Sequence, residues 1–267
     1  MEPATKKLLE DSEDGDRIPG ALIAAKLIET ETAAVLGVLS RKVLGQYELV
    51  LPTGGAADVV AYVGPNILQI ERANQFNPAE FRFWVALHEM THRAQFQGIP
   101  WLRDYFMSLV SEMVESSQPE PDRWDRVMDE LASRWQAKIP LIDERGVFGL
   151  FATPEQRGII DRIQALMSFL EGHGHVVMDR LGADHLKSQD RMSRVLKARR
   201  QDKRTRAFFR ITGLEMKLRQ YEAGEKFIAG VERLAGWEAV RLAFRGASSL
   251  PTLDEIGAPD RWLARVD

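Results

Sequence analysis

The amino-acid sequence predicts a mainly α-helical protein that carries one small β element. After residue 78, apolar residues recur at the three- and four-residue spacing of amphipathic helices, whereas short β-rich runs occur only before that point. With 267 residues, 45% of them hydrophobic and 28% charged, the chain can bury a sizeable core. It has no cysteine, which excludes disulfides, thiolate metal sites and cysteine nucleophiles.

The β structure is expected in the N-terminal third. Two β-rich runs flank the pair Gly54-Gly55, and this arrangement predicts a β-hairpin. Such a sheet could align an extended peptide along its edge strand. In chain order we expect a mobile acidic lead-in, one helix and two strands, at residues 1–17, 21–44, 47–51 and 58–63.

Helices account for the remainder. Prolines at positions 119, 121 and 140 interrupt the helical pattern and predict loops. The pattern predicts helices at about residues 78–97, 100–116, 122–138, 154–181, 187–211 and 213–245. We expect one domain over residues 18–267, with a sheet-and-helix lobe at about 18–117 and a helical lobe at about 118–267.

The most informative stretch is His88-Glu89-Met90-Thr91-His92. In a helix, positions four apart lie nearly above one another, so both imidazoles face the same side. Two such histidines can bind one zinc ion, and Glu89 can act as a general base toward water. Composition alone predicts this string in roughly one chain in a hundred, so a chance surface helix is the alternative.

The surrounding sequence favours the metal site. Asn77 suits an N-cap, Pro78 the first helical position, and Glu80 the position from which a capping-box carboxylate reaches back. The predicted apolar surface of this helix comprises Phe81, Trp84, Val85, Leu87, Met90 and Thr91. Polar ligands in such a helix are costly to bury unless something binds them.

A catalytic zinc site needs a third protein ligand, and Glu171 is the strongest candidate. It continues the apolar stripe of a second helix, which Thr153, Pro154 and Gln156 begin with a capping box. The stripe comprises Ile159, Ile160, Ile163, Leu166, Met167 and Leu170. A carboxylate on that side needs a partner; the alternative to a metal is an internally hydrogen-bonded polar seam.

Two residues beyond Glu171 could support the ligands. His175 and Asp179 follow it at four-residue intervals on the same face, which places them beside the ligands or at the substrate. His175 is also the nearer rival ligand, whereas His173, about 200° around the helix from Glu171, should face away. Gly172 and Gly174 predict that another backbone packs there or that bulk is excluded beside the ligand.

The remaining candidates are weaker. Glu112 and Glu115 follow the motif at a suitable distance, but neighbouring serines predict an exposed position. Tyr221 could stabilise an oxyanion near zinc; the alternative is a core phenol with a satisfied hydroxyl. His185 follows a helix end and is predicted to face solvent.

Six stretches carry a resemblance to a known family: Leu51–Gly55, Val63–Ile67, Trp84–Phe96, Met167–Asp179, Leu218–Glu222 and Leu250–Leu253. Together they resemble the zincin-like metallopeptidases or hydrolases, a family of uncharacterised bacterial proteins sometimes labelled as associated with biosynthesis of a deazaflavin coenzyme. The resemblance covers the chain from about Gly45 to its end. It implies a zincin-like fold, zinc on His88, His92 and a downstream residue, and peptide hydrolysis as the chemistry.

Charge is uneven only in residues 191–210, which carry nine basic side chains and one acidic one. This segment could bind phosphate, nucleic acid or an acidic peptide. We favour a solvated helix face that pairs with the protein's own acidic groups, because aromatics are not interleaved with the basic residues. The formal net charge of the chain, -3, gives no general attraction to nucleic acid.

No apolar run approaches the roughly 18 residues that span a bilayer, and the polar start is no signal peptide. We therefore expect a cytoplasmic protein. The predicted function is a zinc-dependent hydrolase, by resemblance a metallopeptidase, that acts on a peptide or another small carbonyl substrate. A catalytically inactive zinc-binding scaffold and an anion binder that uses residues 191–210 are the alternatives.

Overall fold

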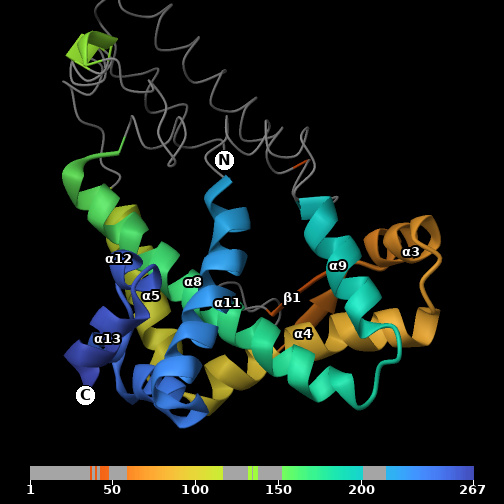
Figure 1. Ribbon diagram of the computed structural model, residues 1–267. Coiled ribbons are helices and arrows are strands. Elements are labelled where there is room, and N and C mark those ends of the chain that lie inside the picture. The colour runs from red at the N-terminus through yellow and green to blue at the C-terminus, as the bar shows by residue number, and fades with distance from the viewer. Residues whose placement is uncertain are drawn as a thin grey trace, which may run out of the picture. The chain divides into compact units, whose positions relative to one another are not determined.

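The computed structural model describes residues 37, 40, 43–47, 59–116, 132–133, 135–137, 152–200 and 215–267, without the side chains of 197, 199–200 and 215–221 (Figure 1). The chain divides into two compact units, residues 1–43 and 44–267, and all elements named below belong to the second. Four predicted features lie wholly or mostly outside the described residues: the lead-in at 1–17, the helix at 21–44, the turn at 54–55 and the helix at 122–138.

Two short strands form the β element. β1 (Gly45–Tyr47) pairs with β2 (Val60–Tyr62) in an antiparallel ladder that joins Gly45 to Tyr62 and Tyr47 to Val60. The fold class is therefore confirmed as mainly helical with one small antiparallel sheet. The first strand begins at Gly45, earlier than the predicted start at residue 47.

α4 (Pro78–Gly98) carries the HExxH string and matches the predicted helix. The Asn77 side chain accepts hydrogen bonds from the backbone N–H groups of Ala79 and Glu80, at 3.0 and 3.2 Å. The Glu80 carboxylate does not close a capping box. It accepts instead from the N–H and hydroxyl of Ser188, because that residue offers two donors, and these bonds lower the pKa of Glu80. Met90, predicted to be part of the apolar surface, is 43% exposed.

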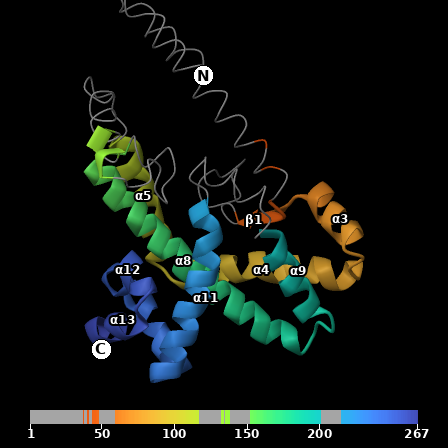
Figure 2. The same ribbon diagram turned by 45° about the horizontal axis from the view of Figure 1, so that its top comes forward.

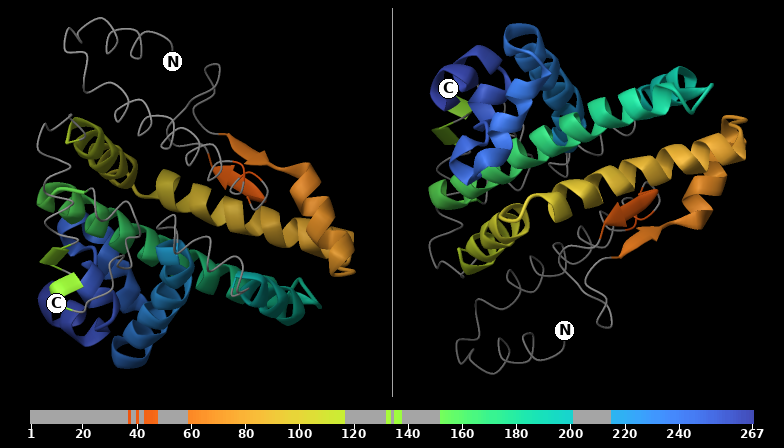
Figure 3. Two further views of the ribbon diagram at one scale, coloured as in Figure 1. Left: turned by 90° about the horizontal axis from the view of Figure 1, so that it is seen from above. Right: turned by 90° about the horizontal axis from the view of Figure 1, so that it is seen from below.

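α8 (Pro154–Ala183) runs beside α4 (Figure 3). Thr153 and Gln156 form the predicted capping box at its start. Four residues of the predicted stripe are buried: Ile159, Ile160, Leu166 and Leu170. The hairpin packs on the side of α4 away from α8, and α11 (Glu215–Ala235) packs on the opposite side of α8.

Shorter helices complete the described part, and three of them were not predicted. α5 (Leu102–Glu115) and α9 (Gln189–Arg200) fall within predicted helices. α3 (Gly64–Ala73), α12 (Leu253–Ile256) and α13 (Pro259–Val266) are too short to repeat the helical pattern more than a few times. No helix in the described ranges is both long and apolar enough to cross a bilayer.

The α-helix predicted over residues 213–245 is wrong over its last ten residues, 236–245. Gly236 adopts φ 81°, a left-handed conformation that glycine adopts readily, and α11 ends just before it. The chain continues as a 3₁₀ helix over Trp237–Arg245 and then a short one over Ala247–Ser249.

Two apolar clusters flank the place where α4 meets α8. One gathers α3, the first half of α4, the end of α8 and α9, with Phe81, Val85 and Met178 among its buried residues. The other gathers the end of α4, α5, the first half of α8, α11 and the C-terminal helices. Along α4 the HExxH string lies between Val85 and Phe96, and along α8 Glu171 and His175 lie between Leu170 and Met178. The polar residues thus lie where the two apolar clusters meet.

α11 crosses α8 with the two backbones in contact (Figure 2). A Cβ on Gly172 would lie 2.2 Å from the carbonyl carbon of Gly224, and a Cβ on Gly224 would lie 1.9 Å from the carbonyl oxygen of Ser168. This confirms that another backbone packs against Gly172.

Gly224→Ala is expected to destabilise the protein by about 3 kcal/mol or more, the upper end of overpacking costs, because the obstructing atoms are backbone. Urea unfolding followed by circular dichroism measures this. Gly158→Ala is the matched control, since a Cβ on that glycine of α8 would contact nothing within 4 Å. It should be neutral or slightly stabilising, and equal losses in both variants would contradict the prediction.

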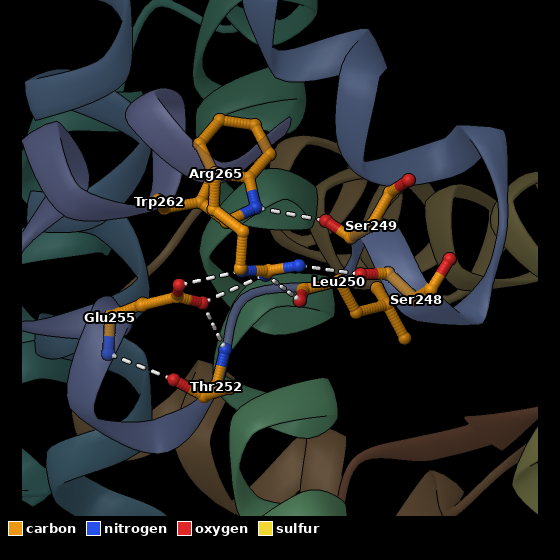
Figure 4. Close-up of polar contacts among 7 residues, drawn as sticks. All are labelled: Ser248, Ser249, Leu250, Thr252, Glu255, Trp262 and Arg265. Atoms are coloured by element: carbon orange, nitrogen blue, oxygen red, sulfur yellow. Dashed lines mark hydrogen bonds and ion pairs between the residues drawn. The ribbon is translucent and has the colours of Figure 1, made fainter. Parts of the chain in front are cut away.

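The C-terminal helices are held by one arginine (Figure 4). Arg265 forms ion pairs with Glu255 at 2.7 and 2.8 Å and donates to the carbonyl oxygens of Ser248 and Leu250. The buried Trp262 donates its indole N–H to Ser249 O at 2.8 Å. The hydrogen bonds from Arg265 lower the pKa of Glu255.

This depressed pKa predicts a pH-dependent stability. A carboxylate whose pKa is lower in the folded state stabilises that state above its unfolded pKa, and the contribution is lost as pH falls through the folded pKa. Glu255→Gln should therefore cost roughly 1 kcal/mol at neutral pH, and the difference from wild type should shrink in acid. Urea unfolding across pH tests this. Glu238→Gln, from an exposed pair with Arg241, is the control expected to change little.

Candidate metal centre

His88, His92 and Glu171 converge where α4 meets α8. One ligand atom from each lies within 4.8 Å of the others. Glu171 Oε2 is 3.3 Å from His92 Nε2 and 3.8 Å from His88 Nε2, and Glu171 is only 6% exposed. This is the only such cluster of potential metal ligands among the described residues.

The cluster has the dimensions of a zinc site. With bonds of about 2.0–2.1 Å, two ligand atoms of a tetrahedral zinc ion lie about 3.3 Å apart. The shorter observed separation equals that value, and the longer exceeds it by half an ångström. Within the described part of the chain, His92 Nε2 is buried and makes no hydrogen bond of acceptable geometry. Two imidazoles and one carboxylate fit zinc and leave its fourth position open.

The neighbours of His88 and His92 restrict both rings. The His88 ring stacks on Trp84 and meets the His92 ring edge-on, at centroid distances of 6.2 and 4.7 Å. Burial acts to lower the pKa of His92, but its net shift is upward because Glu171, Gln95 and Glu89 favour the protonated ring. Gly174 lies beside this ligand: a Cβ there would be 3.4 Å from His92 Cε1, an ordinary van der Waals contact, so the predicted exclusion of bulk does not extend to a methyl group at this position.

Glu89 lies beneath the hairpin. It is 6% exposed, and a Cβ on Gly45 of β1 would lie 2.7 Å from Glu89 Cγ and 2.8 Å from its Oε1. A side chain at position 45 would therefore displace the carboxylate, so glycine is required for this close approach. The sequence contains Gly45 but gives no sign that it meets Glu89.

Tyr62 is a further residue of the site that the sequence did not indicate. It pairs with Gly45, and directly opposed residues of an antiparallel ladder project from the same face. Its side chain therefore leaves the hairpin on the face that covers Glu89. Burial and then the charge of Glu89 raise the pKa of the Tyr62 hydroxyl, which keeps it protonated. The side chain is 45% exposed, so it can meet an incoming molecule.

His175 and His173 occupy different surroundings. The His175 ring is 2% exposed, meets the His88 ring edge-on at 5.4 Å and lies 3.5 Å from Glu225 of α11, measured from Nδ1 to Oε1. His173 is outside the ligand cluster: it stacks on Trp237 and contacts the amide of Gln95. Burial and the nearby His92 lower the pKa of His173 to about 4, so its ring is neutral at pH 7.

The other predicted candidates lie elsewhere. Asp179 accepts a hydrogen bond from the Gln189 amide at 3.0 Å. Glu112 pairs with Arg162 at the surface, Glu115 is exposed, and His185 is exposed as predicted. Tyr221 belongs to α11, but its side chain lies outside the described part.

The basic segment is described only as far as residue 200. Arg191 donates to the carbonyl oxygens of Asn74 and Gln75, at 2.6 and 3.3 Å, and its guanidinium lies over the Phe76 ring. Arg194 donates to Asp190 O. Within the described residues these two arginines contact backbone carbonyl oxygens, whereas the prediction was of pairing with the protein's acidic groups.

Comparison with known proteins shows the family of this chain. The sequence model of the zincin-like metallopeptidases matches residues 6–263, and the chain belongs to that family. A protein from Chloroflexus aurantiacus, whose crystal structure is described as "a putative hydrolase with a novel fold", is 32% identical. The match covers 91% of this chain and 70% of that one, with a TM-score of 0.62. No curated protein sequence matches the chain. The family implies zinc binding, and family and cluster together indicate a zinc hydrolase.

Proposed function

We propose that the protein is a zinc-dependent metallopeptidase with His88, His92 and Glu171 as the protein ligands of the metal. The observation that carries this proposal is the placement of Glu171 Oε2 at 3.3 and 3.8 Å from the two imidazole Nε2 atoms. The histidines come from one helix and the carboxylate from another, so the fold brings together a set that fits zinc.

The chain's own residues would share the chemistry. Bound zinc would polarise a substrate carbonyl and lower the pKa of a water molecule. Glu89 would accept the proton of that water and deliver it to the leaving amine. Tyr62, which projects from the same sheet face that covers Glu89, would donate a hydrogen bond to the substrate, and Tyr221 would be a second candidate for this role.

An unbiased peptide library tests the proposal most directly. Zinc-loaded wild-type protein, with metal content measured by elemental analysis, is incubated with the library and the products are identified by mass spectrometry. We expect about one zinc per chain and a recurring cleavage pattern that chelation abolishes. Failure of the protein to take up zinc at neutral pH would overturn the metal site.

A catalytically inactive zinc-binding scaffold is the second candidate, and the burial of Glu89 beneath Gly45 is the observation that favours it. In this arrangement a substrate has little access to the Glu89 carboxylate. Stoichiometric zinc without cleavage of any library peptide would support the scaffold over the peptidase.

A further inference from the structure

Gln95 lies three residues after His92 on α4 and is 4% exposed. Its amide has three contacts. Oε1 is 2.9 Å from His92 Nδ1, while Nε2 is 2.9 Å from the carbonyl oxygen of Leu170 and 3.0 Å from His173 Nδ1. Gln95 thus links a proposed zinc ligand on α4 to the residue that precedes Glu171 on α8.

The backbone contact fixes the orientation of this amide. A carbonyl oxygen can only accept, so the atom of Gln95 that faces Leu170 O must be the NH₂ nitrogen. The amide oxygen then faces His92 Nδ1, and because that oxygen can only accept, Nδ1 must carry a proton. In a neutral imidazole the other nitrogen then has a free lone pair, and His92 Nε2 is the atom that faces Glu171.

We propose that Gln95 is a positioning residue that holds His92 in the tautomer and orientation needed to bind zinc through Nε2, and that fixes His92 against the segment of α8 that carries Glu171. The inference rests on the proposed zinc site. Substitution of a residue that holds a ligating imidazole in this way commonly weakens metal binding by about 10–100-fold.

The chain offers variants that separate this role from a merely structural one. Gln95→Met removes both the acceptor and the donor at similar size, whereas Gln95→Glu keeps an acceptor for His92 and loses the donor to Leu170 O. Gln189→Met is the matched control. Gln189 is 6% exposed and donates to the α8 backbone at Asp179 O, but the polar groups it contacts are not proposed ligands.

Zinc affinity, measured by competition with a chromophoric chelator, and unfolding of the metal-free protein are the two readouts. We expect Gln95→Met to weaken zinc binding by about 10–100-fold and Gln95→Glu to stay within about threefold of wild type, although both lose stability. Gln189→Met should lose stability with unchanged zinc affinity. Wild-type affinity in Gln95→Met, or equal weakening in all three variants, would overturn the inference.

A second measurement tests the role of Gln95 in the metal-free protein. Long-range ¹H–¹⁵N correlation spectra of the metal-free protein at about pH 9, where imidazoles are neutral, report the His92 tautomer. We expect the Nδ1–H form in wild type and a mixture in Gln95→Met. If wild type binds no zinc but shows this difference, the proposed function fails and the role of Gln95 in holding His92 stands. An unchanged tautomer would contradict the inference even if zinc binds.

Discussion

Glu171→Gln is expected to weaken zinc binding more strongly than loss of a residue that only supports a ligand, which typically costs about 10–100-fold in affinity. The substitution keeps the size of a buried side chain but removes the negative charge placed 3.3 and 3.8 Å from the two imidazole nitrogens. Zinc content after dialysis and affinity by chelator competition measure the effect. His92→Ala should lose the metal as well, because it removes a second ligand of the same set.

His175→Ala is the control that decides between the two candidate third ligands. His175 packs against the His88 ring and beside Glu225, so its loss should reduce zinc affinity by no more than about 10–100-fold. The opposite pattern, with His175→Ala devoid of zinc and Glu171→Gln nearly normal, would show that the ligand is His175.

The sequence was sufficient to select His88, His92 and Glu171, the three clustered residues, which lie on long helices. His88 and His92 share a face because of helical geometry alone, and Glu171 could be selected because it extends the stripe that ends in Leu170. Both inferences depend on the 3.6-residue repeat, which is local. The same repeat placed α4 and α8 within a few residues of their observed bounds.

Gly172 indicated a closely packed backbone, but the sequence did not show which residues of different elements meet. That Gly45 covers Glu89 depends on how the hairpin docks on α4, and that Glu225 lies beside His175 depends on the crossing of α11 over α8. Gln95 shows the limit most clearly. Its position three residues after His92 was visible in the sequence. The orientation of its amide, however, is fixed by the hydrogen bond to Leu170 O, which is far away along the chain.

Predictions from local sequence patterns were also wrong where a residue distant in the sequence competed for a side chain. Glu80 stood at a capping-box position, yet Ser188 offers it two donors and takes the carboxylate away from the helix start. The end of α11 was misplaced because the apolar pattern continues past Gly236, while the left-handed conformation of that glycine breaks the helix. A repeating pattern indicates which residues can be buried, but it does not show where the backbone turns.

Glu89→Gln is expected to retain zinc and to lower peptide hydrolysis by about 10²–10⁴-fold, the usual contribution of a general base. An amide of the same size fits beneath Gly45 but does not accept a proton from water. Because Glu89 is not one of the three clustered ligands, zinc stoichiometry should match that of wild type. The measurement is turnover of a peptide from the library screen, with metal content determined on the same sample.

Gly45→Ala provides an independent way to disturb the same carboxylate. A methyl group at position 45 would lie 2.7–2.8 Å from the Glu89 side chain, so Glu89 must shift although its chemistry is unchanged. We expect zinc to be retained and activity to fall, since small displacements of catalytic groups are costly. If both variants keep near wild-type turnover, Glu89 is not the base. If only Gly45→Ala remains fully active, Glu89 can act from a shifted position and the hairpin is not needed to place it.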